Sequence, residues 1–414
     1  MSSEMKIKKG YVPELRFPEF RNDTEWDVVT VGSKATKVGS GITPKGGDKN
    51  YKKEGRPFIR SQNIGWGHLV LDDVTFINDD THSTFSSTEI KANDVLLNIT
   101  GASIGRSAIA DNSIQGGNVN QHVCIIRTKK SELKPYFLNQ YLLSSDGQKK
   151  IDSFQAGGNR QGLNFTQIRS FTLLLPSIKE QQKIADCLSS LDKLILLQAK
   201  KIFALQQYKM GLMQKLFPAE GETVPTLRFA EFQKSWTLKE VGEIFKVTRG
   251  NVLSMELVQE YKTNENPYPV YSSQTKNRGV SGFYSTFLYE DAITWTTDGA
   301  NAGDVNYRAG KFYCTNVCGV LISKDGHANI CIAEMLNRIS RKHVSYIGNP
   351  KLMNGVMKKI VLSIPSVAEQ KKISNCLSSI NSLISMESQK LAVLKNHKTG
   401  LIQQLFPAMD EVNG

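Results

Sequence analysis

Amide and guanidinium side chains gather on glycine-containing loops in both halves of this 414-residue chain. The segments GGNRQG (157–162) and SQTKNRG (273–279) mix Asn, Gln and Arg with glycines, which allow another molecule to approach the backbone closely. Asn and Gln can bond to adenine through two atoms, and Arg to guanine, at roughly 1–3 kcal/mol of discrimination for each good pair. The candidate DNA-contacting residues are Arg60, Gln62, Asn63, Trp66, Arg106, Asn120, Gln121, Arg160, Gln161 and Asn164 in the first half, and Ser273, Gln274, Lys276, Asn277, Arg278, Asn301, Asn316, Lys351 and Asn354 in the second.

Residue patterns that carry out covalent chemistry do not occur in the sequence. It has no GxxxxGK[ST] phosphate loop, and its six histidines show neither HExxH spacing nor a GxSxG partner. The segment NPYP (266–269) is close to the Asn-Pro-Pro-Tyr signature of adenine methyltransferases, but its prolines stand in a different order and no glycine-rich cofactor loop accompanies it. We therefore expect no catalytic residue, no metal ligand and no cofactor bound by this chain.

The charge balance favours a polyanionic partner. Lys and Arg number 52 against 39 Asp and Glu, which gives a net charge of +13, and nucleic acid is the commonest partner of so basic a protein. No apolar run approaches the length of a membrane span, and the opening MSSEMKIKKG has no apolar signal segment, so we expect a cytoplasmic protein. Cys314 and Cys318 stand among apolar residues and are expected to be buried thiols.

Two long stretches are expected to position these loops. Residues 176–217 begin PSIKEQQKIADCL, and residues 365–406 begin PSVAEQKKISNCL; the two align without a gap. From Lys179 to Leu216 there is no proline and only one glycine, so a single helix would be about 57 Å long. Ser177 with Glu180, and Ser366 with Glu369, predict a capping box at the start of each helix.

The apolar residues of both stretches recur at alternating steps of four and three, which predicts a coiled-coil seam. Two steps are polar at matching places, Gln198 and Lys209 in the first stretch and Glu387 and Lys398 in the second, as expected of positions that fix register. The predicted seam residues are Ile184, Leu188, Leu191, Ile195, Ile202, Leu205, Leu212 and Leu216, and Ile373, Leu377, Ile380, Ile384, Leu391, Leu394, Leu401 and Leu405.

The rest of the chain is also written twice. The opening VPELRFPEF (12–20) returns as VPTLRFAEF (224–232), and the second copy is shorter by 23 residues between opening and helix. We expect two pseudo-repeated mixed α/β domains, an α+β fold, separated by two long helices that form an antiparallel coiled coil. The expected parts are a polar leader (1–11), a first domain (12–175), a first spacer helix (176–218), a linker (219–223), a second domain (224–364), a second spacer helix (365–407) and a tail (408–414).

Short strands separated by turns are predicted between opening and helix. In the first copy they are residues 56–64, 68–77, 94–101, 103–110, 121–128 and 171–176, with a helix at 134–154. Residues 268–275 and 291–303 of the second copy stand opposite 56–63 and 94–105 of the first. In that alignment Arg60 becomes Ser272, Asn98 becomes Trp295, and Arg106 has no evident match. Differing polar residues on a common scaffold indicate two domains that read different surfaces.

This organisation resembles that of the specificity subunit of type I restriction-modification systems. The resemblance is carried by the two openings, by DVLLNITGASIGR (94–106) and GNVNQHVCIIR (117–127), and by LPSIKEQQKIADCL (175–188) with IPSVAEQKKISNCL (364–377). It covers the chain from about residue 12 to residue 408.

The resemblance implies a non-catalytic subunit with two target recognition domains, each reading one half of a split double-stranded DNA target. It also implies two methyltransferase subunits docked on the helices and restriction subunits joined to that core. The N6-adenine methyltransferase and ATP-dependent endonuclease activities would reside in these partners, which would use S-adenosylmethionine, ATP and Mg. Leu194, Leu197, Leu383 and Met386 flank the seam and are expected to face the methyltransferase subunits.

Two other interpretations remain open from the sequence. A coiled-coil scaffold with basic domains would bind nucleic acid by charge alone, and its binding would fall with salt without preferring any sequence. A methyltransferase in its own right would bind a cofactor. A sequence-specific reader, by contrast, keeps a large ratio of specific to competitor binding.

Overall fold

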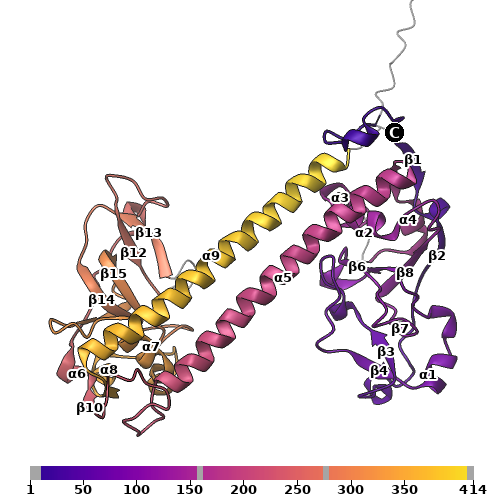
Figure 1. The fold of residues 1–414 in the computed structure, drawn as a ribbon. Helices are drawn as coiled ribbons and strands as arrows, with labels where there is room; N and C mark the ends of the chain where they lie inside the picture. The colour runs from indigo at the N-terminus through magenta and orange to yellow at the C-terminus, as the bar shows by residue number, and fades with distance from the viewer. Residues whose placement is uncertain (1–10, 156–161, 274–278, 408–414) are drawn as a thin grey trace, which may run out of the picture. The chain divides into compact units, whose positions relative to one another are not determined.

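The computed structural model describes residues 11–155, 162–273 and 279–407, which divide into two compact units. Unit 1 contains the described residues up to Ala199 and from Gln389 onward, and unit 2 contains those from Lys200 to Ser388. Each unit holds one mixed α/β domain and one part of each long helix, α5 (Ile178–Leu216) and α9 (Val367–Leu405) (Figure 1).

Unit 1 contains three small sheets, with strand orders β2-β8-β5-β6, β4-β3-β7 and β1-β9. Strands β3 and β7 pair in parallel, and the other named pairs of this unit are antiparallel. The strands are β1 (Asp27–Thr30), β2 (Ala35–Ser40), β3 (Arg56–Ile59), β4 (Thr75–Ile77), β5 (Val95–Asn98), β6 (Ser107–Ile109), β7 (Asn118–Val119), β8 (Val123–Thr128) and β9 (Thr172–Leu175), and the short helices are α1 (Asp79–Ser83), α2 (Pro135–Leu143), α3 (Ser145–Ser153) and α4 (Phe165–Ser170).

Several of the elements expected in this domain differ from the prediction. The strand predicted at 56–64 ends at Ile59 and is followed by a 3-10 helix (Ser61–Asn63), and the strand predicted at 103–110 is limited to β6. The helix predicted at 134–154 is two helices, because the backbone of Ser144 is extended and its Oγ accepts a hydrogen bond from the Gly147 N–H at 3.1 Å, which starts α3 anew. The strand predicted at 68–77 is limited to β4, because its first part is turn and bend.

Unit 2 repeats the plan with a larger sheet, of strand order β11-β16-β14-β15-β12-β13, and a separate pair β10-β17. Strands β12 and β15 pair in parallel, as β3 and β7 do in unit 1. The elements are β10 (Thr237–Glu240), α6 (Val241–Ile244), β11 (Lys246–Arg249), β12 (Tyr268–Tyr271), β13 (Val280–Tyr284), β14 (Tyr289–Thr296), β15 (Val305–Cys314), β16 (Cys318–Ile322), α7 (Ile330–Ile339), α8 (Asn354–Lys358) and β17 (Val361–Ile364).

The core of each unit joins its domain to the long helices. In unit 1 a cluster around Trp26, Phe137 and Phe406 includes residues from the beginning of α5 and the end of α9. In unit 2 a cluster around Trp236 and Trp295 includes the end of α5 and the beginning of α9. Because apolar burial dominates folding free energy, each domain is anchored on the helices rather than tethered to them.

The two long helices pair antiparallel within each unit. In unit 1, Ile184 shares a core with Leu405, and further along the helices Asp192 bonds to Lys398 at 2.6 Å. In unit 2, Leu216 shares a core with Ile373, and the buried Glu387 bonds to Lys201 at 2.8 Å. All sixteen predicted seam residues are buried or half-buried.

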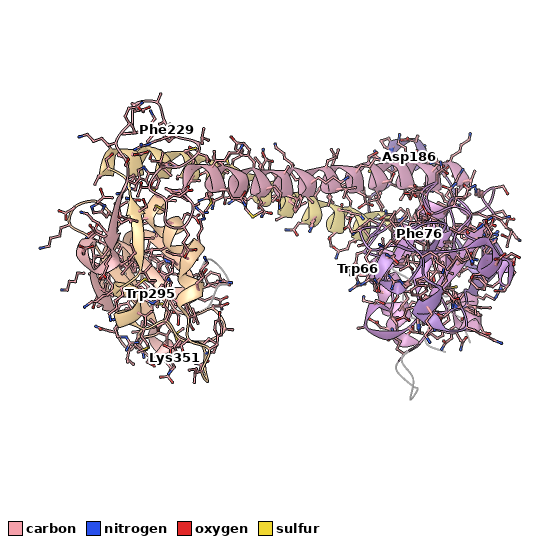
Figure 2. All side chains as sticks on the ribbon, turned by 90° about the horizontal axis from the view of Figure 1, so that it is seen from below. Trp66, Phe76, Asp186, Phe229, Trp295 and Lys351 are labelled. Atoms are coloured by element: carbon pink, nitrogen blue, oxygen red, sulfur yellow. The ribbon has the colours of Figure 1, made fainter. Side chains whose placement is uncertain are left out.

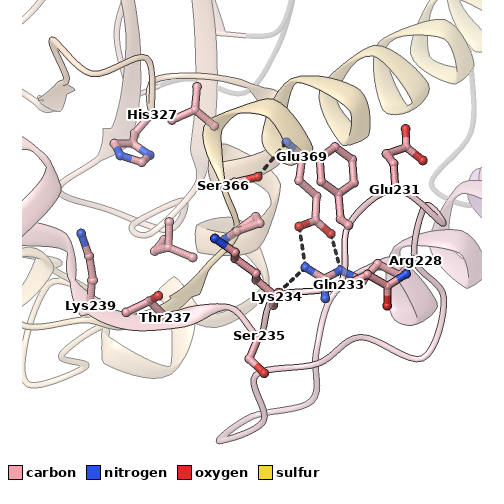
Figure 3. Close-up of a pocket in the computed structure, with 14 residues that line it drawn as sticks. Arg228, Glu231, Gln233, Lys234, Ser235, Thr237, Lys239, His327, Ser366 and Glu369 are labelled. Atoms are coloured by element: carbon pink, nitrogen blue, oxygen red, sulfur yellow. Dashed lines mark hydrogen bonds and ion pairs between the residues drawn. The ribbon is translucent and has the colours of Figure 1, made fainter.

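The repeated opening segments fasten the helix ends. Arg16 bonds to the buried Glu180 near the start of α5 through two nitrogens at 2.8 and 2.9 Å, and the neighbouring Leu15 N–H donates to the Gln404 carbonyl near the end of α9. The ion pair raises the pKa of Arg16. Unit 2 does the same with Arg228 and Glu369, beside a pocket of about 540 Å³ between the opening segment and the start of α9 (Figure 3). Each opening therefore holds the start of one long helix through an ion pair between an arginine and a buried glutamate, and we call these two ion pairs the clamps.

The predicted capping boxes form only in part. Ser177 Oγ accepts a hydrogen bond from the Glu180 N–H, and Ser366 Oγ accepts one from the Glu369 N–H, each at 3.3 Å. The two glutamate carboxylates do not turn back to the cap residues, because they bind the arginines of the clamps.

Other expectations concern thiols and membranes. Cys314 and Cys318 are buried free thiols, as predicted, and burial raises the pKa of Cys318 to about 11. Among the described residues, no helix combines the length and apolar character needed to cross a membrane.

Candidate nucleic-acid interface

A tight turn between β7 and β8 displays one of the predicted residues in unit 1. The Asn120 N–H donates to the Ile59 carbonyl at 3.0 Å, and the Val123 N–H donates to the Asn120 carbonyl at 3.3 Å. The Asn120 side chain is buried, and its Oδ1 accepts from the His122 N–H at 3.1 Å. Gln121, at the tip, is exposed. The turn therefore uses Asn120 as an internal brace and presents Gln121 to solvent.

Two other segments are bound to this turn. The Ile99 N–H donates to the His122 carbonyl at 3.0 Å, and the Leu163 N–H donates to the Ile99 carbonyl at 2.9 Å. These bonds bring together residues 99–106, 120–122 and 162–164, which we call the first edge. Four of the predicted residues, Arg106, Asn120, Gln121 and Asn164, belong to it.

Unit 2 builds the same arrangement with the same backbone bonds. The Thr315 N–H donates to the Tyr271 carbonyl at 2.9 Å, and the Cys318 N–H to the Thr315 carbonyl at 3.0 Å. The Thr297 N–H donates to the Val317 carbonyl at 3.0 Å, and its own carbonyl accepts from Leu352 at 2.8 Å. Residues 297–304, 315–317 and 351–354 form the second edge, which contains Asn301, Asn316, Lys351 and Asn354.

These bonds give a register between the copies that corrects the sequence alignment. The Asn98 N–H donates to the Arg106 carbonyl at 2.9 Å, and the Thr296 N–H donates to the Asp304 carbonyl at 3.0 Å. Asn98 therefore corresponds to Thr296 rather than to Trp295, and Arg106 corresponds to Asp304. The one-residue error matters because neighbours on a strand face opposite ways: Trp295 is buried, with its indole N–H bonded to the Leu352 carbonyl.

Three predicted residues of unit 1 lie around Asp73, in the loop that begins directly after Ile59, the residue to which the turn of the first edge is bonded. Gln62 Nε2 donates to the Asp73 carboxylate at 2.6 Å, and Arg60 lies 3.4 Å from it and also over the ring of Tyr51. Asn63 is 1% exposed and donates to the Val70 and Asp73 carbonyls. Its amide holds the loop together, so Arg60 and Gln62 are the groups that this loop can offer to a ligand.

The remaining predicted residues differ in availability. Trp66 is 54% exposed (Figure 2), and Asn164 is an exposed cap whose Oδ1 accepts from the Gln167 N–H at the start of α4. The Nε of Arg106 is buried with no hydrogen-bond partner among the described residues. Outside the described residues lie Arg160, Gln161, Gln274, Lys276, Asn277 and Arg278.

In unit 2, Asn316 and Lys351 are exposed and Ser273 and Asn301 are half-buried. The Lys351 ammonium lies 3.9 Å from the Asp298 carboxylate, on the side of the domain away from the long helices (Figure 2). Asn354 Nδ2 donates to the Thr248 carbonyl at 3.3 Å, so part of its amide is used within the fold.

A fixed positive charge lies within the sheet of unit 2. Arg308 is 8% exposed, its guanidinium carbon lies 3.8 Å from the centre of the Tyr271 ring, and its Nε donates to Thr294 Oγ1 at 3.0 Å. Burial lowers the pKa of Arg308 from its usual value, but a guanidinium stays protonated at neutral pH.

The sequence did not single out three side chains that lie around Gln121. The Thr43 hydroxyl donates to Gln121 Oε1, Gln121 Nε2 lies 3.2 Å from His122 Nε2, and His122 Nδ1 lies 2.5 Å from the Thr100 hydroxyl. The spacing of the six histidines predicted no catalytic or metal-binding role for them, and it did not place His122 beside Gln121. The one local signal was the glycine at Gly41, which allows the segment carrying Thr43 to meet the turn.

Two units with the same edge, each mounted on antiparallel long helices, define a duplicated recognition protein. The chain belongs to the family described as "Type I restriction modification DNA specificity domain", whose sequence profile matches it twice, at residues 23–207 and 233–396. It is thus a specificity subunit with two target recognition domains.

Individual relatives agree over the whole length. The chain is 24% identical to the putative type I restriction enzyme MjaX specificity subunit of Methanocaldococcus jannaschii, over 97% of this chain and 96% of the relative. The crystal structure of a type I restriction-modification S subunit from M. genitalium matches the fold with a TM-score of 0.67 at 17% identity, covering 96% of this chain and 100% of that one. A second solved structure, described as the structural basis of complex assembly and conformational transition of the type I R-M system, also matches the fold. Its TM-score is 0.53 at 15% identity, and the match covers 92% of this chain and 98% of that one.

Proposed function

We propose that each unit reads one half of a split double-stranded DNA target through its edge, and that the chain carries out no chemistry itself. The observation that carries this proposal is the edge built twice from equivalent backbone bonds but displaying different side chains, Gln121, His122 and Arg106 in one copy and Asn316, Val317 and Asp304 in the other. One scaffold that carries two different sets of side chains, with Gln121 and Asn316 exposed and the other four half-buried, is suited to two different short sequences.

The catalytic steps belong, in this proposal, to partners. Two methyltransferase subunits dock on the long helices, restriction subunits join that core, and these partners use S-adenosylmethionine, ATP and Mg. Support comes from apolar side chains left outside the seam: Leu194, Leu197 and Met386 are exposed and Leu383 is half-buried. Large apolar side chains that are exposed close together, as Leu194 and Leu197 are on α5, are typical of a surface that another protein covers.

The test is selection from a random double-stranded DNA library by this chain assembled with its methyltransferase subunits. We expect two short fixed sequences separated by a constant gap, and a large ratio of specific to competitor binding that persists as salt rises. A scaffold that binds by charge alone would enrich no sequence and would lose affinity with salt, and that result would reject the proposal. Omitting this chain should abolish the preference.

A further inference from the structure

We infer that Gln121 and Asn316 are equivalent base-reading residues, one in each recognition domain, and that each selects adenine in its half of the target. The inference rests on the proposed function. Both side chains are amides, both are exposed, and both occupy the tip of the same turn, directly before the residue whose carbonyl is held by Ile99 or Thr297. An amide in the major groove bonds to adenine N6 and N7 together.

The turn is suited to reading because its backbone is fixed on both sides. In unit 1 its first residue bonds to the end of β3, and in unit 2 the equivalent residue bonds to the end of β12. The far side is bound to the loop that follows β5 or β14. A side chain on so constrained a backbone loses little freedom on binding, which favours a selective contact.

Side-chain bonds fix the orientation of the Gln121 amide. Its Oε1 accepts from the Thr43 hydroxyl, and its Nε2 lies at hydrogen-bond distance, 3.2 Å, from His122 Nε2. A neutral imidazole carries one N–H, and with that hydrogen on Nδ1, donated to Thr100, Nε2 is free to accept from Gln121. One amide N–H and one lone pair of Oε1 remain. Adenine N7 needs the former and its N6 amino group the latter.

Unit 2 achieves the same presentation with a shorter side chain. Val317 stands where His122 stands in unit 1, so the group that orients Gln121 has no counterpart at that position. Asn has one fewer rotatable bond than Gln, and fixing it costs less side-chain entropy. His122 is therefore a positioning residue of the first edge alone.

Basic residues near each turn can hold the DNA backbone. The exposed Lys45 is two residues from Thr43, which bonds to Gln121, and the second edge carries the exposed Lys351. Lysines bind phosphates without reading sequence, and such contacts fix the register in which a neighbouring amide meets a base edge.

The experiment repeats the library selection with variants of the chain in complex with its methyltransferase subunits. We expect Gln121→Ala to lower the preference for adenine at one position of one half-site by roughly 5- to 150-fold, and Asn316→Ala to do the same at one position of the other. His122→Val introduces the residue that unit 2 already holds there, so it should fold, and should weaken the same position as Gln121→Ala. His122→Gln, which keeps an acceptor, should retain the preference.

Asn112→Ala and Asn264→Ala remove exposed amides elsewhere in the two units and serve as matched controls that should leave both half-sites unchanged. Unaltered half-sites in Gln121→Ala and Asn316→Ala would overturn the inference, as would loss at several positions at once or selection of a base other than adenine at the affected position. Failure of the unsubstituted chain to select any sequence would instead reject the proposed function, and the inference with it. Thermal unfolding of each variant separates a lost contact from a lost fold.

Discussion

At the residue scale, Arg16 and Arg228 connect each opening segment to the start of a long helix. Each faces a glutamate that is only 1% exposed, Glu180 or Glu369, so removing the arginine leaves a buried carboxylate without its cation. Loss of one partner of a buried pair costs about 3–5 kcal/mol. We expect Arg16→Ala to lower the hydrogen-exchange protection of the first turns of α5, and Arg228→Ala that of the first turns of α9.

Lys183→Ala is the matched control, because Lys183 and its partner Glu19 are both exposed and solvent screens such surface pairs. Equal protection in Arg16→Ala and Lys183→Ala would mean that the clamp contributes no more than a surface ion pair. Protection lost in both units of Arg16→Ala would mean that the clamps do not act separately.

Residue type alone did not distinguish side chains that are available to contact a base from side chains that form hydrogen bonds within the fold. Asn63, Asn120 and Gln121 all stand on polar loops, and the sequence assigned them the same role. The structure buries the first two, because their amides satisfy backbone groups of tight turns that are not visible in the residue order. Gln121 differs only in standing at the tip of a turn, which depends on pairing between strands far apart in sequence.

At the scale of elements, one glycine allows the segment that follows β2 to approach the turn at residues 120–122, which we call the reading turn. A Cβ on Gly41 would lie 1.5 Å from the Val119 carbonyl oxygen, whereas a Cβ on Gly39 would meet nothing within 4 Å. We expect Gly41→Ala to destabilise unit 1 by about 1–3 kcal/mol, as overpacking does. The same shift should weaken the half-site that Gln121 reads, because Thr43 moves with the segment.

Thermal unfolding and library selection measure both effects, with Gly39→Ala, two residues earlier and within β2, as the control. Normal selectivity in Gly41→Ala would show that the position of Thr43 does not matter to reading. A loss in Gly39→Ala as large as in Gly41→Ala would show that the effect is not one of close approach.

The exposed apolar face of the long helices gives a second prediction at this scale. Leu194 and Leu197 are three residues apart, so they lie on one side of α5, and they are 53% and 62% exposed. We expect the double change to Glu to weaken binding of a methyltransferase subunit at least about tenfold, because it places charge in an apolar contact. Titration of the purified subunits measures this.

Gln207→Glu adds charge at an exposed polar position of the same helix that is ten residues from Leu197 and thirteen from Leu194, so it lies on another side of α5 and should leave that affinity unaltered. Unchanged binding by the double variant, with the fold intact, would place the methyltransferase subunit elsewhere.

Long elements could be predicted from sequence and short ones could not. The step of four and three over α5 and α9 involves sixteen residues, and a pattern of that length specifies both the helix and its inward face. Strand β7 has two residues and β6 has three, too few for any alternation to be read. These short strands carry the edges, which is why the reading turn was not predicted as a unit.

At the scale of the whole molecule, duplication explains what the sequence revealed. The clamp arginines recur in equivalent openings because they bind the starts of equivalent helices, and such positions must keep their residue type. The edges need only a common backbone, so their side chains diverged until the alignment slipped by one residue at Asn98. The architecture could be predicted because the packing residues recur in both copies. The edges could not be predicted because their side chains differ between the copies.

Helix length provides the last prediction. Seven residues added to both α5 and α9 after Ala199 and Ser388, where the two units divide, would keep the seam in phase, because seven is the repeat of a coiled coil. Each helix would lengthen by about 10 Å, which corresponds to as much as about three base pairs of DNA. If the helices set the unread gap, library selection should return the same two half-sites with a longer gap.

Four residues added to both helices make an informative comparison, since that insertion disturbs the heptad phase and should lower the stability of the coiled coil. Seven added to one helix alone should unpair the seam and weaken selection of both half-sites, because the two helices no longer match in length. An unchanged gap with both half-sites retained in the doubly extended chain would show that something other than these helices spaces the readers. In that case, the buried Glu387 and its bond to Lys201 would serve the stability of the helix pair and not the geometry of the target.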